Sequence, residues 1–381
     1  MVVSTLRYRF SDSTSITFLT LSLFLLTSGG FFIVGAPCTT FDFIVIGRCG
    51  ESFGVDTMSS CTIFTVTMGN ITLFGNNEDY SLPGTYVWLM PPQMLELPSE
   101  TISIYGAIFF GFDGNDQSVD GYPQGGMNDQ GLCCDGNGLP EAPINPYPER
   151  ETPYAYPFYQ ILWECSTVIE TIEWFETHYL GSSLPGQFHF ADATGDAVVI
   201  SAGTNGELAY TRIGNGTYLV STNFNLANLE NGEYPCSRYQ TACSRLDEIE
   251  SETDLTIEGC RDILEAVHQA GITAYSNIFD LVKRDTYIYQ RHDFSKVIKL
   301  NLEEELDKVI PGAEGVISET PLLVKAIRIG DLFASSIPPF IGTVLCVVCL
   351  SVGIVVTIAL VIHYQKKQRK AKMDQTLNME I

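Results

Sequence analysis

The feature that most constrains this chain is an uncharged apolar segment near its C-terminus, which runs for 23 residues from Phe340 to Ile362. As a helix with a rise of 1.5 Å per residue, the segment would span about 35 Å, slightly more than the hydrocarbon core of a bilayer. Five basic residues follow it directly: Lys366, Lys367, Arg369, Lys370 and Lys372. Because basic residues collect on the cytoplasmic side of a membrane, this pattern predicts a transmembrane helix over 340–364 and a cytoplasmic basic tail over 365–381. The main part of this single-pass membrane protein is then extracellular or lumenal.

The N-terminus carries a second apolar segment. Arg7 and Arg9 precede this segment, it continues to Val34, and the small residues Gly35 and Ala36 close it. A basic lead, an apolar stretch and small residues are typical of a secretory signal peptide, which we expect over residues 1–36. The apolar stretch is long for a signal peptide, so an uncleaved signal anchor is the alternative.

Composition limits the remaining function classes. The chain has 45 acidic and 21 basic residues, a formal net charge of −24, and a field of this sign repels the phosphate backbone of nucleic acids. We therefore expect no nucleic-acid partner. Nine of the 11 cysteines precede the C-terminal apolar segment, which suits an oxidising compartment. An odd number leaves one thiol unpaired; if that thiol is Cys61, the other eight can form at most four disulfides.

The part of the chain between the apolar segments is predicted to hold one α+β domain over 61–310, followed by a juxtamembrane segment over 311–339. Strand-like runs rich in β-branched residues recur, and Gly69-Asn70 joins the first two as a hairpin. The expected strands are 62–68, 71–74, 197–202, 208–213, 217–222 and 286–290. Apolar residues at helical spacing predict amphipathic helices over 161–175 and 257–267. A region dense in Gly, Pro, Asn and Asp, 113–158, indicates a long loop.

A candidate nucleophile stands at the start of the first expected strand. Cys61 opens this strand, and Asp79 lies at the end of the partner strand in Gly75-Asn76-Asn77-Glu78-Asp79. Antiparallel pairing would bring these two ends together, so a thiol and a carboxylate would meet there. Taken alone, the pattern also fits a small buried core cysteine.

Several ordered motifs strengthen the catalytic interpretation. They are Cys61-Thr62, Gly75 to Asp79, Gly126-Met127-Asn128-Asp129-Gln130-Gly131-Leu132, Asp135-Gly136-Asn137, Thr222-Asn223-Phe224 and Ser237-Arg238. In this order they resemble the linear amide C–N hydrolases of the N-terminal nucleophile (Ntn) class. That class includes choloylglycine hydrolases, penicillin V acylases and proteins similar to isopenicillin N acyltransferase. The resemblance covers residues 61–305.

The resemblance implies a fold and a maturation step. The fold is a four-layer αββα sandwich, and cleavage between Ser60 and Cys61 would remove 37–60 as a propeptide. Cys61 would then carry a free α-amine with a pKa of about 8, against about 8.5 for its thiol. The amine can therefore accept the thiol proton, and the thiol can form an acyl-thioester with a small amide substrate.

The resemblance also implies roles for four further residues. Asp79 would orient the amine, Asn137 and Asn223 would donate to the oxyanion, and Arg238 would fix Asp79 or the nucleophile. No catalytic histidine, cofactor or metal is needed by this mechanism, and we expect neither a cofactor nor a metal site.

One departure from the family pattern affects the expected substrate. Choloylglycine hydrolases usually have Arg where this chain has Asn76, so the acyltransferase-like branch fits better than bile-salt hydrolysis. Two alternatives to hydrolysis stay open: acyl transfer through the same acyl-enzyme, and a catalytically silent cell-surface binding domain with Cys61 in a disulfide. The sequence leaves the oligomeric state open.

Overall fold

The structure of the protein is a computed structural model that describes residues 61–80, 84–112, 123–228, 234–309, 317–318 and 325–335. The expected signal segment, propeptide, transmembrane helix and basic tail lie outside these residues. Within the described part, no helix is both long and apolar enough to cross a membrane.

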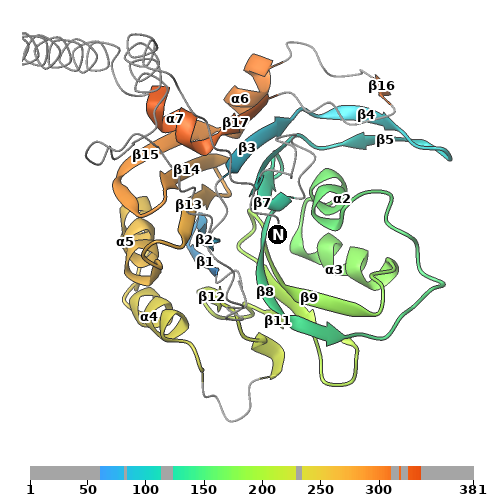
Figure 1. Cartoon of the computed structure of the whole chain (residues 1–381), viewed down its shortest axis with the longest axis horizontal. Coiled ribbons are helices and arrows are strands. Elements are labelled where there is room, and N and C mark those ends of the chain that lie inside the picture. Colours follow the sequence, from blue (N-terminus) through green and yellow to red (C-terminus); the bar gives the residue numbers. More distant parts are fainter. Residues whose placement is uncertain are drawn as a thin grey trace, which may run out of the picture. The chain divides into compact units, whose positions relative to one another are not determined.

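The strands are β1 (Thr62–Met68), β2 (Ile71–Asp79), β3 (Thr85–Met90), β4 (Gln93–Glu96), β5 (Thr101–Ile104), β6 (Ala107–Phe112), β7 (Pro123–Asn128), β8 (Cys133–Pro143), β9 (Ser183–Ala191), β10 (Ala197–Ala202), β11 (Leu208–Arg212), β12 (Tyr218–Ser221), β13 (Thr273–Asp280), β14 (Asp285–Gln290), β15 (Asp293–Asn301), β16 (Ile317–Ser318) and β17 (Lys325–Arg328). The helices are α2 (Pro157–Glu164), α3 (Val168–Thr177), η1 (Leu226–Asn228), α4 (Ser237–Leu246), α5 (Ile257–Val267), α6 (Leu302–Val309) and α7 (Ile329–Ser335). Figure 1 shows these elements along the chain.

Two large sheets form the centre of the domain. One has six strands in the order β12-β1-β2-β13-β14-β15, and the other has eight in the order β11-β10-β9-β8-β7-β6-β3-β17. A small third sheet joins β16, β4 and β5. The expected hairpin of 62–68 and 71–74 is β1 and β2, and β2 continues to Asp79. Neighbouring strands in the two large sheets pair antiparallel, so short connections suffice between many of them.

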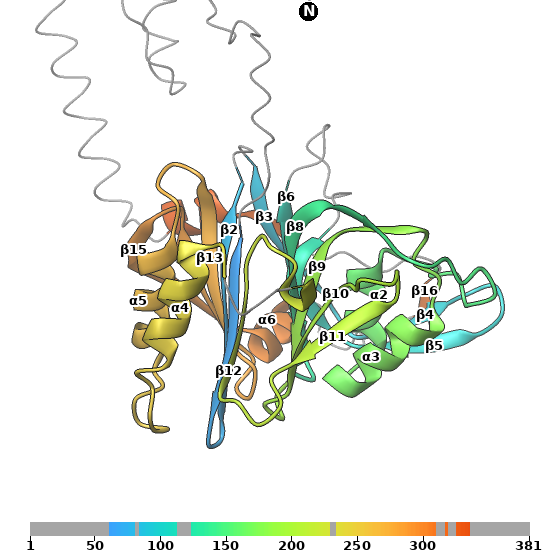
Figure 2. The same cartoon turned by 90° about the horizontal axis from the view of Figure 1, so that it is seen from below.

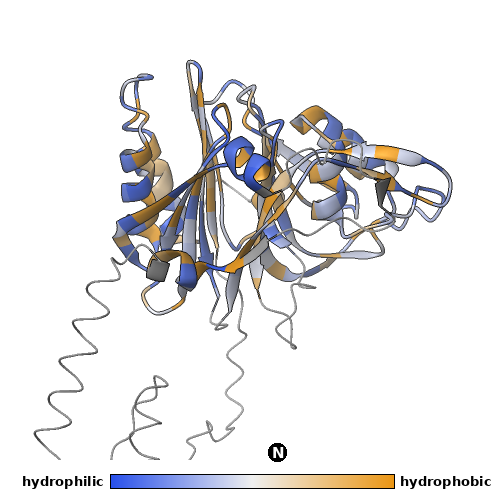
Figure 3. Cartoon of the chain, turned by 90° about the horizontal axis from the view of Figure 1, so that it is seen from above, coloured by the Kyte–Doolittle hydropathy of each residue, from blue (hydrophilic) through white to orange (hydrophobic). Residues whose placement is uncertain are grey.

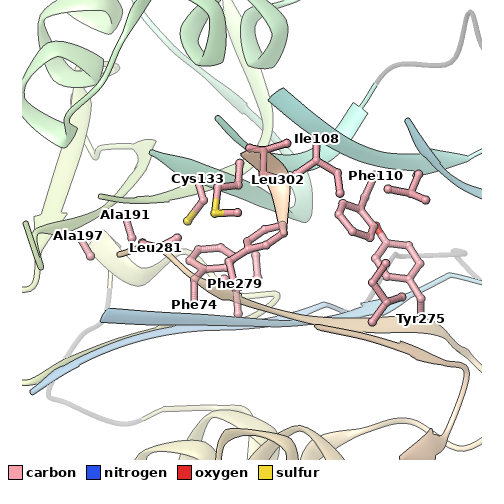
Figure 4. Close-up of a cluster of buried hydrophobic side chains, with 14 of the residues drawn as sticks. Phe74, Ile108, Phe110, Cys133, Ala191, Ala197, Tyr275, Phe279, Leu281 and Leu302 are labelled. Carbon is pink, nitrogen blue, oxygen red and sulfur yellow. The ribbon is translucent and has the colours of Figure 1, made fainter. Parts of the chain in front are cut away.

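Apolar clusters order these elements into four layers. Phe64 and Leu73 pack with residues of α4 and α5 on one face of the six-stranded sheet. Phe74 and Phe279 lie on its other face, against the eight-stranded sheet, and Figure 4 shows this inter-sheet core. Phe190 and other residues of the eight-stranded sheet pack against α2 and α3. Figure 2 shows the resulting helix, sheet, sheet and helix layers, the αββα order that the resemblance implied.

The covering helices are amphipathic, and in Figure 3 each carries both hydrophilic and hydrophobic residues. The helix predicted over 161–175 is in fact two, α2 and α3. The physical reason is a capping box: the Thr167 side chain accepts from the backbone N–H of Glu170, whose side chain accepts from the Thr167 N–H. This cap begins α3 as a separate helix. Ile169, which the apolar spacing places on the buried face, consequently points outward, and 56% of its surface is exposed.

The region 113–158 is not the continuous loop that its composition indicated, because it contains β7 and β8. Two of its glycines allow neighbouring strands to approach closely. A Cβ atom on Gly125 would lie 2.6 Å from the carbonyl oxygen of Cys134, and a Cβ atom on Gly126 would collide with the carbonyl oxygen of Ile108. The domain also extends past residue 310, where we expected it to end. Strand β17 pairs with β3, and Ile329 and Phe333 of α7 join the inter-sheet core.

The expected disulfides are absent from the described residues, where all seven cysteines are free: Cys61, Cys133, Cys134, Cys165, Cys236, Cys243 and Cys260. Neighbours on a strand point to opposite faces, and Cys133 accordingly lies in the inter-sheet core and Cys134 in the core under α2 and α3. These two cysteines serve as small apolar core residues.

Candidate active site

The register of β1 and β2 positions the candidate nucleophile. Thr62 is paired with Asn77, so one residue further Cys61 lies opposite Glu78. Directly opposed residues in an antiparallel pair project to the same face, and successive residues alternate between faces. The side chains of Cys61 and Glu78 therefore lie on the inter-sheet face, whereas Asp79 lies on the helical face.

Arg238, the second residue of α4, links four groups of the site. Its Nη1 donates to the carbonyl oxygen of Cys61 at 2.9 Å and to Oγ1 of Thr62 at 2.7 Å. Its Nη2 donates to Oδ1 of Asn223 at 3.0 Å. Nη1 also forms an ion pair with Oδ2 of Asp79 at 3.8 Å. One guanidinium thus contacts the backbone of Cys61, the hydroxyl of Thr62, the amide of Asn223 and the carboxylate of Asp79, which the several donors of its planar group allow.

Asp79 is held from the helical side of the sheet. Its Oδ2 accepts from Nε2 of Gln269 at 2.8 Å, and its Oδ1 accepts from the hydroxyl of Thr273. Burial raises the pKa of Asp79 to about 6, although the hydrogen bonds from Thr273 and Gln269 and the charge of Arg238 act in the opposite direction. The carboxylate is therefore ionised at neutral pH.

Two amide side chains complete the group. Nδ2 of Asn137, on β8, donates to the carbonyl oxygen of Cys61 at 3.3 Å. Nδ2 of Asn223, just after β12, donates to the carbonyl oxygen of Gly138 at 2.9 Å. The structure thus brings together all five residues singled out in the sequence: Cys61, Asp79, Asn137, Asn223 and Arg238. Their catalytic roles stay predictions.

The thiol side of the site is buried and acidic, and sequence reasoning did not identify it. Cys61 is 1% exposed, and Glu78, Asp135 and Tyr275 around it are buried as well. Burial, followed by the charges of Glu78 and Asp135, raises the pKa of the Cys61 thiol well above its usual value. The thiol is therefore protonated at neutral pH and needs a base before it can attack.

The two acids of this side also have raised pKa values. Burial raises the pKa of Glu78 to about 8. Burial, then the charge of Glu78, raises the pKa of Asp135 well above its usual value. Asp135 accepts hydrogen bonds from Nδ2 of Asn76 and from the backbone N–H of Gly136, both at 2.7 Å. Asn76, which stands where choloylglycine hydrolases usually have Arg, therefore contacts an acid and brings no charge.

Among the described histidines, none donates or accepts a hydrogen bond with the five candidate residues, and the charge of His268 acts on Asp79 only by lowering its pKa. His189 is the buried one between the sheets, where its Nε2 contacts Oγ1 of Thr65 at 3.0 Å and its Nδ1 contacts Oγ of Ser221 at 2.9 Å. Burial lowers its pKa to about 3, so the ring is neutral and serves the packing of β1, β9 and β12.

A small hollow opens beside Asn223. It measures about 120 Å³, and its walls include Leu139, Pro140, Leu184 and Phe224. Because these side chains are mainly apolar, the hollow suits an uncharged group of a few carbon atoms.

Comparison with solved structures finds a similar fold in two variants of the conjugated bile acid hydrolase from Clostridium perfringens. The first aligns with a TM-score of 0.51 and 17% identity over 70% of this chain and 96% of that one. The second has a TM-score of 0.51 and 16% identity over 70% and 97%. The fold is that of the Ntn hydrolases.

A weaker likeness to an Ntn hydrolase was also found. Penicillin V acylase from Agrobacterium tumefaciens aligns with a TM-score of 0.47 and 16% identity, over 64% of this chain and 87% of that one. No family model and no curated protein matches the sequence. The resemblance drawn from the motifs is thus confirmed as a likeness of fold to amide-hydrolysing Ntn enzymes.

Proposed function

We propose that this protein is a cysteine Ntn hydrolase that cleaves the linear C–N bond of a small N-acyl amide. The observation that carries the proposal is the position of Cys61 on an Ntn fold. It lies at the start of β1, its carbonyl oxygen is held by Arg238 at 2.9 Å, and that guanidinium also contacts Asp79 and Asn223. Amide cleavage through a thioester uses a thiol as the nucleophile and hydrogen-bond donors that stabilise the oxyanion. The thiol of Cys61, the carboxylate of Asp79 and two amide side chains are gathered here.

Maturation is part of this proposal. Cleavage after Ser60 gives Cys61 a free α-amine, which can take the thiol proton because the two pKa values are close in unburied groups. The thiolate attacks the substrate carbonyl, the amine of the substrate leaves, and water releases the acyl group from the thioester. Asp79 orients the amine, Arg238 fixes Asp79 and the backbone of Cys61, and Asn137 and Asn223 supply amide N–H groups to the oxyanion. One such donor typically contributes about 3 to 4 kcal/mol to lowering the barrier.

The apolar hollow beside Asn223 supports an acyl group of a few carbon atoms as the part of the substrate next to the scissile bond. Among the described cysteines, Cys61 is a free thiol, which is the state that the hydrolase proposal requires. Acyl transfer to an amine would use the same thioester and the same residues.

The proposal predicts that protein expressed from the full-length sequence and purified in detergent has Cys61 as its first residue. N-terminal sequencing and intact mass check this, and release of free amine from a panel of short-chain and aromatic N-acyl amides measures the hydrolysis. Iodoacetamide should label Cys61 in the cleaved protein and stop hydrolysis. A chain that keeps residues 37–60 and hydrolyses amides at full rate would contradict the amine mechanism.

We further propose that the enzyme is a single-pass membrane protein with its catalytic domain extracellular or lumenal. The support is the uncharged segment Phe340 to Ile362 and the basic residues after it. The chain should stay with the membrane after alkaline carbonate extraction, and a tag placed after Ile381 should be digested by protease only once the membrane is permeabilised. A tag digested on intact cells would contradict this orientation.

A further inference from the structure

The nucleophile has a carboxylic acid as its direct neighbour across the sheet. Strand β2 places Glu78 opposite Cys61 on one side, by the register of Thr62 with Asn77. Strand β13 places Tyr275 opposite Glu78 on the other side. The three side chains form a row on one face, and Figure 4 shows Tyr275 of this row pointing into the inter-sheet layer.

Within the described part of the chain, no ion pair and no hydrogen bond of normal geometry accounts for the burial of this acid. Glu78 is 1% exposed, and neither of its carboxylate oxygens has a hydrogen bond of normal geometry among the described residues. The side chains that interact with it include the Cys61 thiol and Asn76. The hydroxyl of Tyr275, in the same row, also lacks a partner within the described part. Burying an unsupported carboxyl group is costly, so its presence beside the thiol calls for a chemical role.

The maturation step leaves such a role open. Before cleavage the nitrogen of Cys61 is part of a peptide bond and cannot accept a proton, so the α-amine cannot activate the thiol for this first reaction. Among the described residues, His189 does not serve either, because its two ring nitrogens contact Thr65 and Ser221. Asp79 lies on the opposite face of β2 and is occupied by Thr273 and Gln269.

We propose that Glu78 is the general base that activates Cys61 for cleavage of the chain's own bond between residues 60 and 61. This inference rests on the proposed function and adds the residue that starts its maturation. The Glu78 carboxylate takes the thiol proton while sulfur bonds to the carbonyl carbon of Ser60. The C–N bond then breaks, and the proton passes from Glu78 to the departing nitrogen of Cys61. Water hydrolyses the resulting thioester, which leaves a carboxyl group on Ser60 and a free thiol and α-amine on Cys61.

The electrostatics of the site suit this step. Groups that titrate around Glu78 are Cys61 before β1, Asp79 on β2, Asp135 on β8 and Tyr275 on β13. Burial raises the pKa of Glu78 to about 8, and a base whose pKa lies near the working pH is effective in proton transfer. Since only the ionised form accepts a proton, the cleavage rate should rise with pH up to about 8 and level off above it.

Glu78→Gln in the full chain tests the inference, because the amide keeps the size of the side chain and cannot act as a base. We expect cleavage, followed by intact mass, to slow by at least about a hundredfold, within the range that general-base catalysis supplies. The rise in rate toward pH 8 should disappear. Glu78→Asp, which keeps the carboxyl group but shortens it, should restore part of the cleavage. Asp280→Asn is the matched control, since it removes a buried acid at the other end of β13, away from the site, and should cleave at close to the wild-type rate.

A second engineered variant distinguishes a failure of this inference from a failure of the proposed function. A recognition site for an added protease, placed directly before Cys61 in the full chain, exposes the α-amine without self-cleavage. After digestion, the rate of amide hydrolysis by Glu78→Gln should fall relative to the wild type by a far smaller factor than its rate of self-cleavage does. Self-cleavage of Glu78→Gln at the wild-type rate would overturn the role of Glu78 and leave the hydrolase proposal standing. A wild-type chain that is inactive even after digestion would instead overturn the proposed function.

Discussion

Cys61→Ala should leave the chain uncleaved after Ser60 and remove amide hydrolysis. Both reactions in the proposal form a bond to the sulfur of Cys61, so the methyl group of alanine cannot start either one. We expect hydrolysis to fall by at least about ten-thousandfold, which corresponds to about 5.4 kcal/mol of barrier. Intact mass measures cleavage, and release of amine from N-acyl amides measures hydrolysis.

Cys61→Ser is the matched control for this variant. Its hydroxyl keeps a nucleophilic atom in nearly the same place, but it gives up its proton less readily than a thiol. Slow cleavage in Cys61→Ser, together with none in Cys61→Ala, would show that the atom at this position does the chemistry. Cleaved, active Cys61→Ala protein would mean that the nucleophile lies elsewhere in the chain.

The first hairpin could be predicted from the sequence because its signals are local. Gly69-Asn70 and the β-branched runs beside it indicate the turn and the strands, and antiparallel pairing then brings the start of one strand to the end of the other. This is why Cys61 and Asp79 were expected near each other. Counting the alternation of faces one step further would have shown that Glu78, and not Asp79, shares the face of the thiol.

Contacts between distant elements had no such local signal. Arg238 on α4 and Asn137 on β8 reach Cys61 only through the packing of the helical layer and of the second sheet, so they came from the resemblance of ordered motifs. Asp135 stands within the motif Asp135-Gly136-Asn137, but nothing in its spacing shows that β8 faces β2 across the core. The break at Thr167 was missed because apolar spacing continued through it, while the capping box that starts α3 depends on two polar residues.

Asp79→Asn should lower the rate of amide hydrolysis by at least about a hundredfold, which corresponds to about 2.7 kcal/mol of barrier. The amide keeps the shape of the side chain but loses the charge that orients the α-amine. In the wild type, hydrolysis should fall as the pH drops below about 6, because burial raises the pKa of Asp79 to this value and protonation removes the charge. This acid limb should be missing from the pH profile of Asp79→Asn.

The fold offers a control for this variant. The native pKa of Asp79 lies above its usual value, so the folded chain holds that proton more tightly than the unfolded chain does. Ionisation of Asp79 therefore costs stability as the pH rises through about 4 to 6. Asp79→Asn should consequently unfold at neutral pH at no lower temperature than the wild type, so a loss of activity would not reflect a loss of fold.

Arg238→Lys should also reduce hydrolysis, by at least about tenfold, because a single ammonium group cannot hold Cys61, Thr62 and Asn223 as the planar guanidinium does. The ion pair of 3.8 Å between Arg238 and Asp79 predicts that the two changes are coupled. In a double-mutant cycle on the cleaved enzyme, the factor by which the double variant lowers the rate of hydrolysis should be clearly smaller than the product of the two single factors. The reason is that each single change already disturbs the same arrangement. A loss equal to that product would mean that the two residues act independently, with Arg238 acting through the backbone of Cys61 and Asp79 through the amine.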